Sequence, residues 1–202
     1  MGITPEEFEL LQARIKNSSA SVEEIVPQSN PSHQILLGID PSLRGTGYGI
    51  IRIEQNLGRR YPVFLVAGTI KCESTLSHSA CFVKIGQTIR KAIQEYSPTV
   101  CVVEGLFYVH NLRTAIVMGE ARGAGLLVAA ENGLEIYEMA PRRVKQAIVG
   151  YGAAQKLAVA KMVQRMLNLQ ELPAPDAADA LALALAYFQE SGKPVFSPLK
   201  KI

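Results

Sequence analysis

The pattern of apolar and polar residues changes near residue 34. Three runs rich in apolar and β-branched residues follow in succession, at residues 34–40, 47–55 and 61–72, and turn-like segments join them. This arrangement predicts consecutive antiparallel strands. Two later runs, residues 99–104 and 134–139, are too short for helices and predict two more strands.

Segments with helical periodicity lie between the later strands and after them. They are residues 76–96, 112–132, 141–148, 154–169 and 176–190. Gly133 ends the second of them, and Pro173 and Pro175 delimit the last. Three antiparallel strands followed by alternating helices and strands predict an α/β fold with one five-stranded mixed sheet flanked by helices. That order is the layout of ribonuclease-H-like folds.

Residues 1–33 predict an appendage to this sheet. Thr4-Pro5-Glu6-Glu7 has the sequence of a capping box, and Phe8, Leu11 and Ile15 then share one helical face. A stretch rich in Ser, Pro, Asn and Gln follows and is typical of a linker. We therefore expect a domain boundary near His33, with an extension of residues 1–33 and a body of residues 34–202.

Length and composition narrow the class of protein. A chain of 202 residues with 48% hydrophobic content is about one domain with its own core. Its longest apolar stretch, residues 177–188, is shorter than the roughly 20 residues a bilayer span needs and contains Asp179. The N-terminus lacks the features of a signal or transit peptide, and Cys72, Cys81 and Cys101 form no CxxC pair. We expect a cytoplasmic protein with free thiols.

Charge is distributed unevenly along the chain. Residues 1–33 hold two basic and five acidic residues, a net charge of −3, whereas residues 34–202 hold 19 and 13, a net charge of +6. Residues 139–170 contain no acid, and their basic residues are Arg142, Arg143, Lys145, Lys156, Lys161 and Arg165. A solvated helix face usually mixes charge signs, so this segment predicts a surface for a nucleic-acid backbone.

Four carboxylates stand where strands end or a helix begins. Asp40 and Glu104 each end an apolar run, and Asp176 and Asp179 open the last helical segment. Open α/β sheets place reactive groups at such positions, and clustered carboxylates repel one another unless a cation neutralises them. Oxygen ligands of this kind suit Mg²⁺ or Mn²⁺. The sequence therefore predicts a metal site built from three elements.

Each of these acids also has a simpler interpretation. Asp40 opens a glycine-rich turn that is neither a Walker A loop nor a dinucleotide fingerprint, so it could be a solvated residue of an ordinary hairpin. Asp176 and Asp179 share a helix face, but acids in a first helical turn are common as caps. Glu104 is harder to explain structurally, because burying it costs several kcal/mol unless it is paired or metal-bound.

Two further features lie near the predicted site. Phe107 follows Glu104 in a probable loop, where an exposed aromatic can stack on unpaired bases for about 1–3 kcal/mol per base, although core packing is the alternative. The segment 112–132 carries an unusual number of small residues: Gly119, Ala121, Gly123, Ala124, Gly125, Ala129 and Ala130. They permit close helix contact within the fold or across a dimer.

Together these motifs resemble a known family. The segments IDPSLRGTGYG, VVEGLF, MGEARGAG, APRRVKQAIVGYGAAQK and PDAADALALA closely resemble the RuvC-type Holliday-junction resolvases, or crossover junction endodeoxyribonucleases, over about residues 34–190. The resemblance implies a ribonuclease-H-like nuclease domain, a homodimer, and paired cutting of four-way DNA junctions in recombination and repair. It also implies a nucleoid-associated location and the RuvA–RuvB branch-migration complex as a partner.

The resemblance assigns roles by motif position. Asp40, Glu104, Asp176 and Asp179 match the catalytic acids, which would hold two Mg²⁺ ions about 4 Å apart, with Mn²⁺ as a substitute. Phe107 matches the aromatic that stacks at the crossover, while Lys145 and Lys156 match lysines near the DNA backbone and the scissile phosphate. Lys156 would supply charge to the transition state. Arg142 and Arg143 belong to the acid-free segment and are therefore also predicted to contact DNA.

Two departures and two alternatives accompany the resemblance. The family usually begins almost at the first strand, and it commonly has glycine after the proline of the turn, where this chain has Pro41-Ser42.

One alternative function is that of an actin-like or Hsp70-like ATPase. Those proteins need two duplicated domains, and ATP hydrolysis would identify this class. The other is a junction-binding protein without catalysis, which Mg²⁺ would not cause to cleave DNA.

Overall fold

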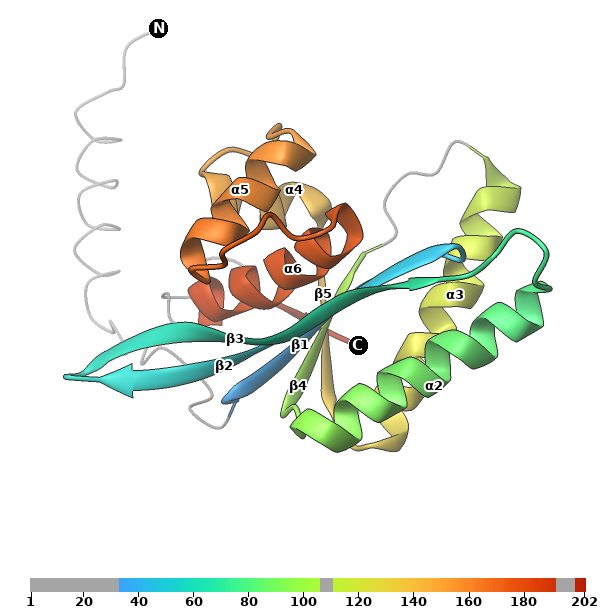
Figure 1. The fold of residues 1–202 in the computed structure, drawn as a ribbon, viewed down its shortest axis with the longest axis horizontal. Coiled ribbons are helices and arrows are strands. Elements are labelled where there is room, and N and C mark those ends of the chain that lie inside the picture. The colour runs from blue at the N-terminus through green and yellow to red at the C-terminus, as the bar shows by residue number, and fades with distance from the viewer. Residues whose placement is uncertain (1–32, 106–110, 192–198) are drawn as a thin grey trace, which may run out of the picture.

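A six-stranded mixed sheet forms the centre of the molecule in the computed structural model, which describes residues 33–105, 111–191 and 199–202 (Figure 1). The strands are β1 (Ile35–Asp40), β2 (Gly45–Asn56), β3 (Arg59–Lys71), β4 (Val100–Glu104), β5 (Glu135–Met139) and β6 (Lys200–Lys201). They lie in the order β3-β2-β1-β4-β5-β6. The first three strands pair antiparallel, β1, β4 and β5 pair parallel, and β6 returns antiparallel to β5.

The central strands are apolar along their whole length because helices cover both faces of the sheet. Leu36, Leu37 and Ile39 of β1 are almost completely buried, as are residues 100–103 of β4. A strand buried on both faces reads as a continuous apolar run, which is how the two segments appear in the sequence. Beyond them, β2 and β3 form a long hairpin that turns at Leu57-Gly58, where both residues adopt positive φ.

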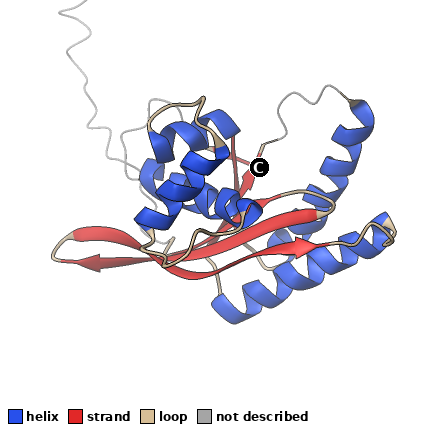
Figure 2. Ribbon diagram, turned by 45° about the horizontal axis from the view of Figure 1, so that its top comes forward, coloured by secondary structure: helices blue, strands red, loops and turns tan. Residues whose placement is uncertain are grey.

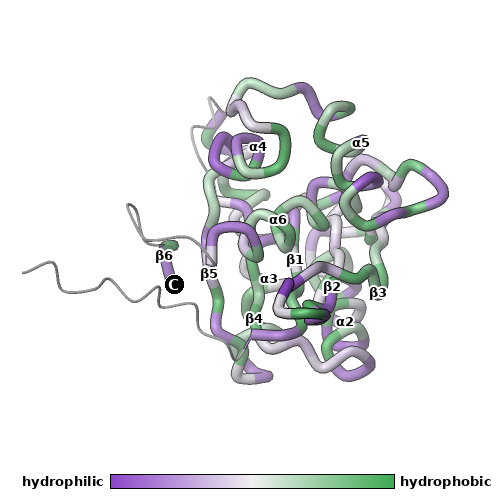
Figure 3. The backbone as a smooth tube through the Cα atoms, turned by 90° about the vertical axis from the view of Figure 1, so that its left-hand side faces the viewer, coloured by the Kyte–Doolittle hydropathy of each residue, from purple (hydrophilic) through white to green (hydrophobic). Residues whose placement is uncertain are grey.

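Helices form a layer on each face of the sheet (Figure 2). They are α2 (His78–Tyr96), α3 (Leu112–Glu131), α4 (Pro141–Val149), α5 (Lys156–Met166) and α6 (Pro175–Ser191). Helices α2 and α3 pack together in one core with β1 and β4, while α4, α5 and α6 share the second core. Ten consecutive or near-consecutive residues of α6 are buried, so this helix is the centre of its layer. By contrast, α4 alternates hydrophilic and hydrophobic residues in Figure 3 and buries only Val144 and Ile148.

The predicted order of strands and helices is confirmed, with one strand more than expected. The additional strand, β6, has only two residues, and both are exposed lysines. Lys200 pairs with Glu138 at 2.8 Å and Lys201 with Glu135 at 2.9 Å, so ion pairs across the edge of β5 hold the segment. A charged dipeptide carries no periodic strand signal, which is why the sequence pattern missed it.

Helix α5 is shorter than predicted. It begins at Lys156 rather than Ala154 and ends at Met166, because Asn168 adopts positive φ just beyond it. The amphipathic helix expected around Phe8, Leu11 and Ile15 lies outside the described residues. No helix within the described ranges is long and apolar enough to cross a membrane.

His33 lies against the body of the fold. It is 6% exposed, and its ring packs edge-on against Tyr137 and Tyr187 at centroid distances of 6.4 and 6.1 Å. Its Nε2 atom lies 3.4 Å from Oε2 of Glu135. The division into residues 1–33 and 34–202 stays a prediction, although His33 packs against residues of the second part.

Candidate active site

Asp40 and Glu104 are brought together by neighbouring parallel strands. Asp40 is the last residue of β1 and Glu104 the last residue of β4, and the pairing of Ile39 with Val103 aligns the two strand ends. Both side chains are half-buried, and their carboxyl groups lie within hydrogen-bonding reach of each other. The two acids thus form a pair at one edge of the sheet, although 64 residues separate them in sequence.

Glycines of the sheet determine how closely α6 approaches this edge. A Cβ atom at Gly38 would collide with the main-chain carbonyl of Ala180, and one at Gly47 would collide with the carbonyl of Asp176. Only glycine leaves space for helix backbone at these positions. Because α6 rests directly on β1 and β2, its N-terminal part, which carries Asp176 and Asp179, lies over the end of β1.

Asp40 is the most perturbed carboxyl group of the site. Burial, the charges of Glu104 and Asp179 and the hydrogen bond with Glu104 together raise its pKa from an ordinary value of 3.8 to about 8, while Lys156 opposes the shift. Asp40 therefore holds a proton near neutral pH when no cation is bound. A shift of this size, caused by burial beside other acids at strand ends, is typical of a functional site.

Glu104 shares this electrostatic environment. Burial raises its pKa, and the hydrogen bond from Asp40 is the largest opposing influence. The charge of Asp179 raises the pKa, whereas Lys156 and Lys145 lower it. The paired carboxyl groups of Asp40 and Glu104 therefore act as a unit that carries less negative charge than two free carboxylates.

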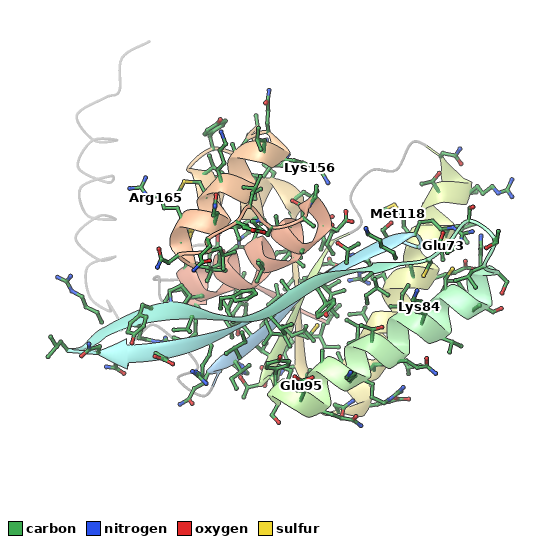
Figure 4. All side chains as sticks on the ribbon, in the orientation of Figure 1. Glu73, Lys84, Glu95, Met118, Lys156 and Arg165 are labelled. Carbon is green, nitrogen blue, oxygen red and sulfur yellow. The ribbon has the colours of Figure 1, made fainter. Side chains whose placement is uncertain are left out.

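Lys156 is a basic residue that bonds directly to one of these acids. Its Nζ atom donates a hydrogen bond to Oδ2 of Asp179 at 2.7 Å, and this bond is the main reason why the pKa of Lys156 is raised. The lysine side chain is 71% exposed, so it can reach toward a bound substrate. Figure 4 shows Lys156 and Arg165 at opposite ends of α5, with Lys156 on the first turn.

Asp176 lies next to the start of β2. Its Oδ2 atom is 3.0 Å from the position that a Cβ of Gly45 would occupy. Within residues 33–105, 111–191 and 199–202, no three His, Cys, Asp or Glu side chains form a group that could hold a metal ion. Glu104 and Asp179 both raise the pKa of Asp40, and the metal site of four carboxylates stays a prediction.

The donor set nevertheless fits a hard divalent cation. The available ligands are carboxylate oxygens, which Mg²⁺ and Mn²⁺ prefer. Burial and the charges of Glu104 and Asp179 raise the pKa of Asp40 despite the opposing charge of Lys156. A cation bound beside Asp40 would favour its ionised form, and binding would therefore release a proton.

The residues predicted to contact DNA differ in their exposure and in their ion pairs within the protein. Arg142, Lys161 and Arg165 are exposed on α4 and α5. Arg143, in contrast, forms a 2.5 Å ion pair with Glu190 of α6 and is part of the packing between the two helices. Lys145 is half-buried and acts on Glu104. Phe107 lies outside the described residues, so its stacking role stays a prediction.

The sequence reading missed one group beside the site. Arg122 of α3 donates to the main-chain carbonyl of Glu104 and pairs with Glu138 of β5. Small residues surround it in MGEARGAG, and the signal for its role is a single basic residue among apolar and small residues of a helix. The interior position of Glu138 in the strand LEIYEM was a second signal.

The family of this chain follows from a match over most of its length. Residues 36–187 match the sequence profile of the family described as crossover junction endodeoxyribonuclease RuvC. The chain belongs to the RuvC family. The matched range includes the ends of β1 and β4 and the N-terminal part of α6, and so it contains every acid of the candidate site.

Individual RuvC proteins give the same result. A crossover junction endodeoxyribonuclease RuvC of Caldicellulosiruptor saccharolyticus is 41% identical over 162 residues, which cover 80% of this chain and 96% of the relative. That of Alkaliphilus oremlandii is 43% identical over 154 residues, covering 76% of this chain and 92% of the relative. The predicted enzyme class, a junction endodeoxyribonuclease, is thereby confirmed at the level of the family.

Solved RuvC structures have the same fold. The structure of Thermus thermophilus RuvC matches with a TM-score of 0.70 at 29% identity, covering 83% of this chain and 99% of that one. T. thermophilus RuvC in complex with a Holliday junction substrate matches with a TM-score of 0.73 at 30% identity, covering 84% and 100%. The predicted ribonuclease-H-like α/β fold is confirmed.

Proposed function

We propose that this protein resolves four-way DNA junctions, in homologous recombination and DNA repair, by metal-dependent phosphodiester hydrolysis. The observation that carries the proposal is the buried acid pair of Asp40 and Glu104, with Asp179 and Lys156 beside it. This group lies at the strand ends of a chain that belongs to the RuvC family. Clustered acids with a perturbed pKa and a nearby cation suit hydrolysis without a side-chain nucleophile.

The acids would hold the metal. We assign Asp40, Glu104, Asp176 and Asp179 as ligands of Mg²⁺, with two ions in each active site and Mn²⁺ as a substitute. When bound, the ions would activate water and stabilise the charge that develops on the phosphate oxygens. Lys156 would either break its hydrogen bond to Asp179 or keep it while it places its ammonium beside the scissile phosphate. Its positive charge would there stabilise the transition state.

The acid-free face would bind the DNA backbone. Arg142, Lys161 and Arg165 expose positive charge on the helices next to the site, and Lys145 lies between that face and Glu104. Contacts of this kind depend on phosphates and weaken steeply with salt. We assign Lys145 and Arg142 to the backbone and Phe107 to base stacking, while the ion pair of Arg143 with Glu190 favours a structural role for that residue.

Two copies of the chain would act together. Leu112, Ile116 and Leu127 of α3 are exposed by 75, 53 and 59%, and their spacing of four and eleven residues places them along one side of the helix. An exposed apolar stripe of this kind suits a homodimer interface. A two-fold dimer would present two sites to two symmetric strands of a junction. On family membership, the RuvA–RuvB complex is our proposed partner.

One assay tests reaction, substrate and metal together. Labelled four-way junction and linear duplex of the same sequence are incubated with the protein, with and without Mg²⁺. We expect paired cuts in the junction only when Mg²⁺ is present. Asp40→Asn and Glu104→Gln should abolish cutting but keep junction binding, whereas Glu95→Gln, an exposed acid on α2, should behave as wild type. Binding without cutting under all conditions would instead identify a junction-binding protein without catalysis.

A further inference from the structure

Arg122 joins three elements at the point where β4 ends. The residue projects from α3, its Nε atom donates to the main-chain carbonyl of Glu104 at 3.4 Å, and its second terminal nitrogen donates to Oε2 of Glu138 at 2.5 Å. The two side chains of the ion pair are only 16 and 13% exposed. We propose that Arg122 is a positioning residue that holds Glu104 in place for the metal, an inference that rests on the function proposed above.

Glu104 lies where the pairing of β4 with β1 ends. The register between the two strands runs from Leu36 and Val100 to Ile39 and Val103, one residue before Glu104. On the other side it pairs with Met139 of β5, and the amide of Gly105 donates to the carbonyl of Met139 at 2.9 Å. The bond from Arg122 to the carbonyl of Glu104 is therefore an additional contact that restrains the last peptide of β4.

The other half of the guanidinium is anchored to the same strand that supports Glu104. Glu138 precedes Met139 in β5, so the ion pair ties α3 to the strand beside β4. Arginine suits this task because its planar fork presents separate nitrogens to two acceptors in fixed directions, whereas the ammonium of lysine acts as a single point. Replacing Arg122 by Lys should keep the charge beside Glu138 but lose the restraint on Glu104.

A matched control separates this restraint from the ion pair itself. Lys200 of β6 pairs with Oε1, the other oxygen of Glu138, at 2.8 Å, and its side chain is 68% exposed. In the described ranges, no hydrogen bond or ion pair joins Lys200 to Glu104. Lys200→Gln therefore removes a charge from the same carboxylate without removing a bond to β4, and the solvent around the exposed ammonium limits what this pair contributes to stability.

The experiment compares Arg122→Lys, Lys200→Gln and wild type in the full chain. Mn²⁺ affinity is measured by titration without DNA, turnover with saturating junction and Mg²⁺, junction affinity without metal, and the temperature of unfolding. For Arg122→Lys we expect Mn²⁺ affinity and turnover to fall about ten- to a hundred-fold, as for other residues that orient a ligand, with junction affinity unchanged. Lys200→Gln should match wild type in every measurement.

Several outcomes would overturn the inference. Wild-type Mn²⁺ affinity and turnover in Arg122→Lys would leave Arg122 with a purely structural role. An equal loss in Lys200→Gln would trace the effect to the charge of Glu138. If Arg122→Lys fails to fold, Arg122→Gln replaces it, since it removes the bond to the carbonyl of Glu104 but leaves Glu138 paired with Lys200, and wild-type Mn²⁺ affinity there would refute the proposal. Because Mn²⁺ affinity is measured without DNA, a wild type that binds Mn²⁺ but does not cut junctions would contradict only the proposed function.

Discussion

At the scale of single residues, the raised pKa of Asp40 beside Glu104 is the most informative property of this molecule. Neither side chain is unusual in itself, but burial and mutual repulsion make their full ionisation unfavourable. The site is therefore prepared for a cation, and its protonation should be visible in experiments that involve no DNA.

The metal-free protein should lose stability as pH rises. The pKa of Asp40 is raised to about 8 in the folded chain, so between pH 4 and 8 the folded state holds a proton that the unfolded state has lost. Stability falls over that range, at most by about 1.4 kcal/mol per pH unit. Urea unfolding of wild type and Asp40→Asn from pH 5 to 9, with a chelator, checks this. Parallel pH curves for the two proteins would contradict it.

Lys156 and Lys145 should differ in the step that they affect. Lys156 bonds to Asp179 at 2.7 Å, so Lys156→Ala should slow cutting at saturating enzyme by about a hundred-fold, in the range for a lost transition-state contact, with junction affinity little changed. Lys145→Ala should mainly weaken junction binding. Single-turnover cleavage and gel-shift titrations separate the two effects. A wild-type cleavage rate in Lys156→Ala would remove that lysine from the scissile phosphate.

At the scale of elements, the contact of α6 with the sheet controls the site. The helix buries most of its length, and glycines beneath it allow backbone-to-backbone contact that no other residue would permit. The position of Asp176 and Asp179 is therefore a consequence of sheet residues that carry no functional group.

Adding one methyl group to this contact should disturb the site. Gly38→Ala and Gly47→Ala should each lower the free energy of unfolding by about 1–3 kcal/mol, as overpacking does, and reduce cutting, because α6 must move away from β1 and β2. Gly86→Ala on α2 is the control, since its added Cβ would lie 3.5 Å from Val128, an ordinary contact, and alanine favours a helix by up to about 1 kcal/mol. Full activity in both sheet variants would show that α6 does not rest on the glycines.

At the scale of the whole molecule, the candidate site and His33 lie at opposite edges of the sheet. The acids lie at the ends of β1 and β4, whereas His33 lies two residues before the first strand and packs near the start of β5. Removing the residues before His33 should therefore not disturb the acids.

Two truncations that differ by one residue should behave differently. Deleting residues 1–32 should leave a folded, active nuclease, whereas deleting 1–33 should lose about 1 kcal/mol of stability, because the packing of His33 against Tyr137 and Tyr187 is lost. Thermal unfolding, oligomeric state and junction cleavage are compared for both. Equal stability of the two truncations would show that His33 contributes nothing, and failure of the 1–32 deletion to fold would place the extension within the domain.

The sequence by itself determined the strands, the helices and the acids that end or begin them. Local periodicity is enough for this, since a buried parallel strand such as β4 must be apolar and a glutamate at its end is conspicuous. The family resemblance rests on the same local segments, and the match over residues 36–187 confirms it.

Only the tertiary structure decided the states and supports of those residues. The proton on Asp40 depends on Glu104 and Asp179, which are distant in sequence, and the restraint on Glu104 depends on Arg122, whose neighbours in sequence suggest nothing but helix packing. The burial of His33 likewise depends on β5 and α6. Such properties follow from desolvation and distance, which exist only once separate elements are brought together.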